Sequence, residues 1–168
     1  MGEHNITLTV TDDGGATAAD TMIVNVLAIF QSGDMWKGLV YETVTSPYTG
    51  RIWLDRNLGA SQACTALDDT SCYGDYYQWG RNTDGHEKID SNITSIQATD
   101  IYNAGNMFIT STSAEYYDWA VYDYDWAGRD INRTMNWSKT DGSSVCPIGF
   151  RVSTLDELSA EANSANIY

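Results

Sequence analysis

Residues 51–88 read RIWLDRNLGASQACTALDDTSCYGDYYQWGRNTDGHEK, and they hold two of the three cysteines of the chain. Residues 50–55, GRIWLD, place three apolar side chains between two charged ones, a pattern that predicts a short buried strand. Residues 73–79 then contain four aromatic side chains in seven positions. We therefore expect the fold to be centred on this stretch.

Four motifs carry a resemblance to a known family. They are TGRIWLDRNLGA (49–60), YGDYYQWGRNTDGH (73–86), FITS (108–111) and CPIGFRVSTLDEL (146–158). In this order they resemble the Fibrobacter succinogenes major paralogous domain, a module of bacterial surface proteins. The resemblance implies a mainly β, α+β fold over residues 31–168, with a C-type-lectin-like core and irregular aromatic loops. Family members continue with a strand-rich second half, which we do not find in this chain.

The composition argues against two classes of function. The formal charge is −14, whereas a nucleic-acid-binding surface must be basic to neutralise phosphates. The mean hydropathy is −0.36, and the longest apolar run, residues 24–30, is short and interrupted by Asn25, so we expect no membrane span. Acidic chains of this kind are typical of extracellular surfaces and of proteins that collect divalent cations. We therefore expect an extracellular or cell-surface location.

Residues 1–30 predict a β-hairpin that resembles part of an immunoglobulin-like domain. Apolar and polar residues alternate on both sides of the segment DDGG (12–15), which has the chemistry of a tight turn. The segment LTVTDDGGATAADT resembles the last two strands of a PKD-type domain, whose earlier strands are missing here. An isolated hairpin is marginally stable in water. We therefore expect Ile6–Val26 to dock on the rest of the chain or to pair with another molecule, including a second copy.

The remaining chain predicts short strands and one helix. Leu39–Val44, Ile52–Leu54 and Phe150–Val152 have the composition of strands. Ser153 has the side chain of an N-cap residue, and acidic residues follow in the first turn. A helix is therefore expected from this point to about Asn163.

The cysteines predict one disulfide. Cys64 and Cys72 flank a polar loop and lack the Cys-x-x-Cys spacing of metal and redox sites. In an exported chain we expect a bond between them that holds the loop. In the family that the motifs resemble, the cysteine of CPIGFR pairs with one in the second half. Cys146 is thus left without an obvious partner, and we expect a piece of a longer protein or a chain completed by other subunits.

Residues 114–137, AEYYDWAVYDYDWAGRDINRTMNW, interleave aromatic and acidic side chains with imperfect helical spacing. We expect an irregular loop with one short turn of helix. Aromatic rings stack on the apolar faces of sugars while carboxylates accept from sugar hydroxyls, so the segment is a candidate binding surface. The alternative is that the rings fill a core that is short of regular structure. The candidate ligand-binding residues are Tyr116, Tyr117, Trp119, Tyr122, Tyr124 and Trp126.

Two groups of acidic residues are candidate calcium ligands, because calcium prefers clustered oxygen atoms. The first group is Asp68, Asp69 and Asp75, and the second is Asp84, Glu87 and Asp90. The sequence contains no DxDxDG loop and no EPN or WND sugar-binding signature. The alternative is that these carboxylates form a solvated acidic surface.

No catalytic constellation can be assigned. His4 and His86 are the only histidines, and neither lies in a triad or an HExxH motif. His86 could be a metal ligand or a base, but local hydrogen bonding in its loop is the stronger expectation. We expect a non-catalytic module that binds a carbohydrate or protein ligand in adhesion. The alternative is a structural subunit of a fibre or oligomer that assembles by β-strand sharing.

Overall fold

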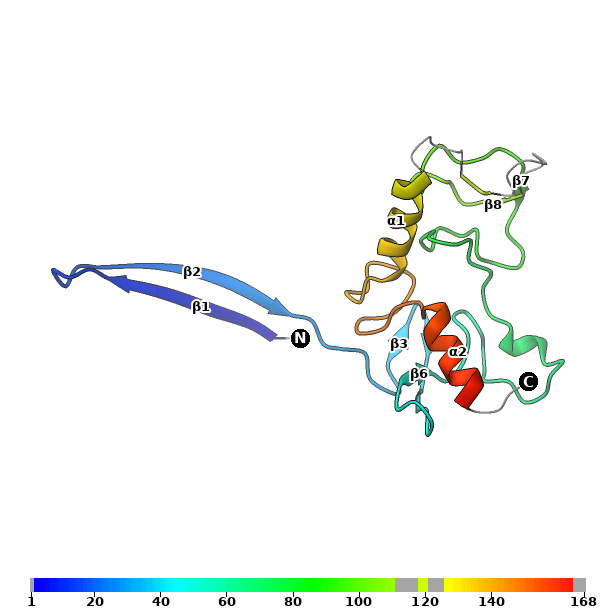
Figure 1. The fold of residues 1–168 in the computed structure, drawn as a ribbon, viewed down its shortest axis with the longest axis horizontal. Coiled ribbons are helices and arrows are strands. Elements are labelled where there is room, and N and C mark those ends of the chain that lie inside the picture. The colour runs from blue at the N-terminus through cyan, green and yellow to red at the C-terminus, as the bar shows by residue number, and fades with distance from the viewer. Residues whose placement is uncertain (1, 111–117, 121–125, 165–168) are drawn as a thin grey trace.

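The structure, a computed structural model, describes residues 2–110, 118–120 and 126–164. Its class is mixed α+β, in which small two-stranded sheets and two helices are joined by long loops (Figure 1). The expected mixture of strands and helix is confirmed at this level. The strands are β1 Gly2–Thr11, β2 Thr17–Val26, β3 Met35–Trp36, β4 Leu39–Val40, β5 Thr43–Thr45, β6 Ile52–Leu54, β7 Ile93–Thr94 and β8 Phe108–Ile109. The helices are α1 Trp126–Trp137, α2 Leu155–Ser164 and the 3-10 turn η1 Thr70–Cys72.

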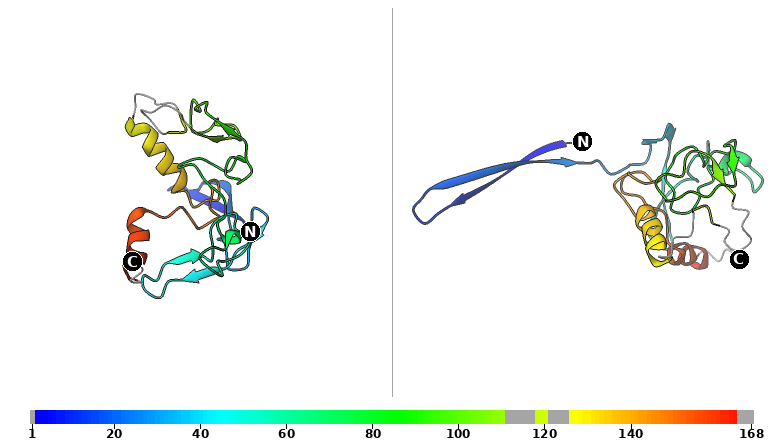
Figure 2. Two further views of the ribbon diagram at one scale, coloured as in Figure 1. Left: turned by 90° about the vertical axis from the view of Figure 1, so that its right-hand side faces the viewer. Right: turned by 90° about the horizontal axis from the view of Figure 1, so that it is seen from above.

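Strands β1 and β2 form a long antiparallel hairpin that projects from the rest of the chain (Figures 1 and 2). The alternating pattern of residues 1–30 predicted this hairpin, and its existence is confirmed. In the turn, the Asp12 carboxylate accepts from Ala16 N–H at 2.7 Å, and Gly15 has a φ of +83° that favours glycine. Neither strand contacts any other helix or strand of the described chain. Of the two arrangements expected for the hairpin, docking on these elements of its own chain does not occur.

Strands β3 to β6 form two small antiparallel hairpins, while β7 and β8 pair in parallel. The expected strand Leu39–Val44 is divided into β4 and the start of β5, because the intervening Tyr41 is buried and accepts from Gly33 N–H through its main chain. The predicted strand Ile52–Leu54 is confirmed as β6. The prediction that it is buried was wrong: Ile52 is 59% exposed, because its side chain lines an open groove.

Helix α2 begins one residue later than expected, because Thr154 rather than Ser153 caps it. Thr154 Oγ1 accepts from Glu157 N–H at 3.2 Å, and Glu157 Oε2 accepts from Thr154 N–H at 2.9 Å. This reciprocal capping box satisfies two main-chain donors at the start of the helix. The residue three positions after Ser153 is Asp156, whose side chain is shorter than that of Glu157. The helix ends at Ser164, next to the expected Asn163.

Helix α1 replaces most of the irregular structure expected near its position. Arg133, Asn136 and Trp137 have helical spacing and therefore share one face. Asn136 Nδ2 donates to Gly80 O, and Trp137 Nε1 donates to Arg81 O. The expected loop was wrong over residues 126–137. The bonds to residues 80 and 81 stabilise the helix, and the spacing of residues within the segment gives no sign of such long-range contacts.

The predicted strand Phe150–Val152 was also wrong. Val152 N–H donates to Trp137 O at the end of α1 (3.1 Å), and Phe150 N–H donates to Pro147 O (2.9 Å). The segment therefore bonds to a helix end and to its own turn instead of to a strand.

The apolar core of the described chain is small. One cluster of buried residues consists of Ala98, Ile109, Trp119 and Ala120. Several fully buried side chains are charged or polar, including Arg81, His86 and Glu87. Neither α1 nor α2, the helices of the described chain, has the length and apolar character needed to cross a membrane. Polar networks in the loops therefore supply much of the internal packing.

Candidate functional site

Arg81 occupies the centre of the loop region and is only 1% exposed. Its Nε donates to Asp84 Oδ2 at 2.7 Å, and one terminal nitrogen donates to Gln78 Oε1 at 2.8 Å. The terminal nitrogens also donate to the main-chain carbonyls of Ala104, Gly105 and Met107. A charged group buried to this degree requires such partners. Arg81 therefore connects its own loop to residues 104–107.

Two arginines and two tryptophans stack beside α1. The Arg133 guanidinium lies 5.3 Å from the Trp79 ring and 4.8 Å from the Trp119 ring, and Arg81 lies 5.6 Å from Trp119. Arg133 also pairs with Asp118 at 2.9 Å. Cation–π contacts of this kind strengthen when water is excluded. The stack therefore stabilises the packing of α1 on the central loops.

Trp119, one of the six candidate ligand-binding aromatic residues, lies in the core. It is 5% exposed, and its Nε1 donates to Trp79 O at 3.1 Å. This position supports the alternative interpretation, in which the rings fill the core. Trp126 is the first residue of α1. The remaining candidates, which are outside the described residues, are Tyr116, Tyr117, Tyr122 and Tyr124.

Asp84, His86 and Glu87 form a cluster whose nitrogen and oxygen atoms all lie within 4.8 Å of one another. His86 is fully buried; its Nδ1 lies 2.7 Å from Asp84 Oδ1, and its Nε2 accepts from Gln78 N–H at 3.1 Å. These roles define a neutral ring that carries its proton on Nδ1. The local hydrogen bonding expected for His86 is therefore present.

The donor set of this cluster does not fit calcium. Calcium takes six to eight oxygen ligands, whereas His86 contributes nitrogen, and its Nδ1 already bonds to Asp84. The carboxylate of Glu87 accepts from Gly85 N–H at 2.9 Å, so it stabilises the turn of its own loop. The calcium expectation for Asp84 and Glu87 thus finds no support in the geometry.

The other candidate calcium ligands have different local roles. Asp69 caps η1, where its Oδ1 accepts from Ser71 N–H at 3.1 Å. Asp75 pairs with Lys88 at 2.8 Å. Within the described residues, these acids do not join a third ligand in a compact group. The two that are simply exposed are Asp68 and Asp90.

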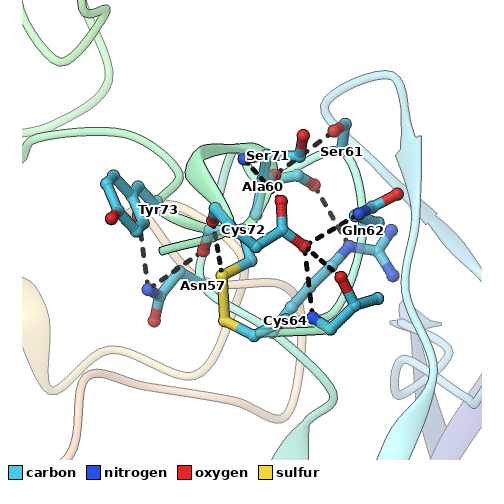
Figure 3. The surroundings of a disulfide bond; sticks show 11 residues. Asn57, Ala60, Ser61, Gln62, Cys64, Ser71, Cys72 and Tyr73 are labelled. Atoms are coloured by element: carbon cyan, nitrogen blue, oxygen red, sulfur yellow. Dashed lines mark hydrogen bonds between the residues drawn. A yellow bond between two sulfur atoms is a disulfide. The ribbon is translucent and has the colours of Figure 1, made fainter. Parts of the chain in front are cut away.

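The expected disulfide between Cys64 and Cys72 is present. Figure 3 shows it beside Asn57, whose side-chain nitrogen donates to Cys72 O and to Tyr73 O at 3.4 and 3.3 Å. The disulfide closes the loop of residues 64–72, and the last three residues of this loop form η1.

His86 makes the stability of the chain depend on pH. Burial lowers the pKa of His86, although its hydrogen bond with Asp84 acts in the opposite direction. The unfolded chain therefore binds a proton near the ordinary pKa of about 6.5, at which the native chain does not. We expect the free energy of unfolding to be level between about pH 7 and 8 and to fall below pH 6.5, by at most about 1.4 kcal/mol per pH unit. Urea denaturation at several pH values measures this slope.

The variants His86→Asn and His4→Gln separate the two histidines. His86→Asn should remove the slope between pH 5 and 6.5, whereas His4→Gln should retain it, because His4 belongs to the projecting hairpin. The depressed pKa values of carboxyl groups such as Glu157 affect stability only at lower pH. A slope that survives in His86→Asn would contradict the assignment.

An open groove of about 870 Å³ lies beside β6. Its volume is in the range of ligand pockets. Phe30 and Phe150 pack edge to face with ring centres 5.9 Å apart, and both line it. Cys146, which forms no disulfide, also lines the groove; burial raises the pKa of its thiol to about 11. The aliphatic lining residues include Ile29, Ile52, Leu54, Leu58, Val152 and Leu158.

One end of the groove carries two guanidinium groups that share one carboxylate. Glu157 accepts two hydrogen bonds from Arg151, at 2.7 and 3.0 Å, and its Oε1 lies 3.7 Å from Arg51 Nε. The hydrogen bonds from Arg151 lower the pKa of Glu157 to about 2. A third arginine, Arg56, pairs with Asp55 at 2.7 Å. The lining of the groove thus contains three arginines and one acidic residue, while Asp55 and Glu161 lie outside the lining and interact with Arg56 and Arg51.

The hairpin presents one apolar face to solvent. The register pairs Ile6 with Met22 and Leu8 with Asp20, so these four side chains share a face. Ile6, Leu8 and Met22 are 51%, 67% and 61% exposed. The opposite face is more polar, and Thr7 and Thr21 hydrogen-bond across it at 3.0 Å. The apolar face contains one carboxylate, that of Asp20.

Sequence reasoning missed the roles of Arg81 and Arg133 and the groove beside β6. Arg81 follows the aromatic run of residues 73–79 after a single glycine, and a basic residue beside such a run is a usable signal for a buried stack. The groove brings together three segments that are distant in sequence, 29–32, 51–58 and 146–158. No local pattern could have indicated it.

No protein-family model, curated protein or solved structure matches the chain. The resemblance to the Fibrobacter succinogenes major paralogous domain therefore stays a prediction that rests on four sequence motifs.

Proposed function

We propose that this chain is a non-catalytic module of an extracellular bacterial surface protein, and that it associates with other protein molecules through the β1–β2 hairpin. Association of this type adds strands to an open sheet edge and gains main-chain hydrogen bonds. It corresponds to a structural subunit of a fibre or oligomer. A C-type-lectin-like core is the fold that we propose for the remainder of the chain.

The exposed apolar face of the hairpin is the observation that carries this proposal. The hairpin has strands of ten residues, and each of its two strands leaves one edge unpaired within the described chain. Large apolar side chains on this face lie in solvent. Burial against a partner would stabilise them by about 25 cal/mol for each Å² of apolar surface removed from water. Exposed edges and faces of this kind are managed in most proteins by charges, proline or a covering element. A partner protein would supply the missing cover.

Light scattering over a range of protein concentrations tests association. We expect the mass of the wild-type particle to exceed 18.6 kDa and to rise with concentration. The variant Ile6→Lys places a charge on the apolar face, and we expect it to remain at the monomer mass. A reductant should not change the wild-type result, because the disulfide Cys64–Cys72 lies within one chain.

Thr9→Lys is the matched control for this experiment. It adds the same charge to the same strand, but the register places Thr9 opposite Ala19 on the other face. We expect this variant to associate like the wild type. A wild-type chain that stays at 18.6 kDa at every concentration would refute self-association.

Adhesion through the aromatic segment remains a separate prediction. The burial of Trp119 removes one candidate from that surface. Binding of a carbohydrate would then depend on the remaining candidates, Tyr116, Tyr117, Tyr122, Tyr124 and Trp126. A glycan-binding assay with the wild-type protein tests it directly.

A further inference from the structure

We propose that the groove beside β6 is the acceptor site for the β1–β2 hairpin of a second copy of this chain. The inference rests on the proposed function and adds to it the receiving surface. The groove and the hairpin are compared in three properties: their unpaired main-chain N–H and C=O groups, their apolar side chains and their charged side chains.

The outer edge of β6 offers main-chain hydrogen-bonding groups to an added strand. At one end of the β5–β6 ladder, Asp55 N–H donates to Glu42 O at 3.0 Å. Bonded pairs alternate along an antiparallel ladder, so Ile52 and Leu54 direct their N–H and C=O groups away from β5. In the part of the chain that the structure describes, these groups have no hydrogen-bond partner. Both residues line the groove.

The apolar surfaces have matching characters. Three consecutive residues of β6, 52–54, line the groove, which indicates that it follows the edge of the strand as well as a face. An added strand would place alternate side chains into the groove, as in other cases of strand addition. The hairpin has large apolar side chains at Ile6, Leu8 and Met22 on one face. Their insertion would cover apolar surface on both copies.

The charges are complementary. Residues 2–26 contain four acidic residues and no Lys or Arg, so the hairpin is strongly acidic. Three arginines line the groove, Arg51, Arg56 and Arg151, against one lining carboxylate, that of Glu157. Two further carboxylates lie outside the lining: Asp55 pairs with Arg56, and Glu161 interacts with Arg51. Asp20 is the carboxylate on the apolar face of the hairpin. In the docked hairpin, Asp20 is a further carboxylate that faces the lining arginines Arg51 and Arg151.

The contact joins different surfaces of the two copies, so the copy that donates its hairpin keeps a free groove, and the copy that accepts it keeps a free hairpin. Such head-to-tail contacts form rings when the rotation closes and open filaments when it does not. The same interface can therefore extend an assembly without any further site.

Charge reversal on either side of the contact tests the assignment. We expect Asp20→Arg, in the hairpin, and Arg51→Glu, in the groove, each to raise the dissociation constant for self-association at least about tenfold. Analytical ultracentrifugation measures this change. An equimolar mixture of the two variants should associate again. In the mixture, the basic hairpin of the first variant meets the acidic groove of the second, and the reverse pair is wild type on both surfaces.

Two variants with the same charge changes are controls. Asp13→Arg alters the hairpin turn outside the apolar face, and Lys139→Glu alters an exposed position that does not line the groove. Both should associate like the wild type. Circular dichroism confirms that each variant is folded, and recovery in the mixture excludes misfolding as the cause of the single-variant defect.

The outcomes distinguish this inference from the proposed function. If Ile6→Lys abolishes association but Arg51→Glu does not, the hairpin drives association and the groove is not its acceptor. The same conclusion follows if the mixture fails to recover, and pairing of hairpin with hairpin would then explain the particle. A wild-type monomer at every concentration would overturn both the function and the acceptor site.

Discussion

Replacement of Arg81 by methionine should lower the free energy of unfolding by about 3–5 kcal/mol. The guanidinium bonds to Asp84, to Gln78 and to three main-chain carbonyls in a region that is almost completely buried. Methionine fills the volume of the stem but leaves the Asp84 carboxylate and several main-chain carbonyls without this donor. Such a loss is a large part of the roughly 5–15 kcal/mol that typically stabilises a domain. Urea denaturation followed by tryptophan fluorescence measures it.

Lys139→Met is the control for Arg81→Met, because it also removes one positive charge but at an exposed position. We expect its effect to stay within about 0.5 kcal/mol. A loss below about 1 kcal/mol for Arg81→Met would mean that the polar network does not hold the loops together.

Replacement of Trp119 by alanine should destabilise the chain by about 3–5 kcal/mol. The ring is buried, it contacts the guanidinium groups of Arg81 and Arg133, and its Nε1 donates to the main chain of Trp79. Alanine would leave a cavity and would remove both cation–π contacts. The free energy of unfolding, measured by urea denaturation, and the far-ultraviolet circular dichroism should both report the loss.

Tyr102→Ala is the matched control, since Tyr102 is an aromatic residue that is 66% exposed. Its effect should remain within about 0.5 kcal/mol. If Trp119→Ala instead kept the wild-type stability and lost a ligand, the residue would belong to a binding surface, as first expected for this segment.

The features that the sequence predicted correctly are local ones. The hairpin follows from alternation with a period of two around a glycine-rich turn, and the disulfide follows from two cysteines on one short loop. Strand β6 lies within a motif whose apolar run is short and bounded by charges. In each case, residues near in sequence determine the structure.

The features that were missed depend on contacts between distant segments. Residues 126–137 form a helix although glycine interrupts them, because Asn136 and Trp137 bond to main-chain groups of residues 80 and 81. Burial of Arg81 requires carbonyls from residues 104–107, which no spacing rule brings to it. The burial of Arg81 therefore depends on tertiary contacts.

The candidate site divides in the same way. Asp84, His86 and Glu87 lie within four residues, so their proximity and the local hydrogen bonding of His86 were predictable. The groove depends on segments that are distant in sequence, and the exposure of the apolar hairpin face depends on how the hairpin projects from the rest of the chain. Neither surface could be assigned before the arrangement of the chain was known.

Residues 2–26 form an acidic hairpin that contains neither lysine nor proline. Because of this composition, ionic strength should affect the association of the chain in two opposite ways. Dissolved ions screen charges over about 10 Å at 0.1 M salt. Screening reduces the repulsion between two hairpins, so added salt favours their indiscriminate edge-to-edge pairing. It also weakens the attraction between a hairpin and the arginines of the groove. Low salt therefore protects the ordered contact, and high salt promotes aggregation in its place.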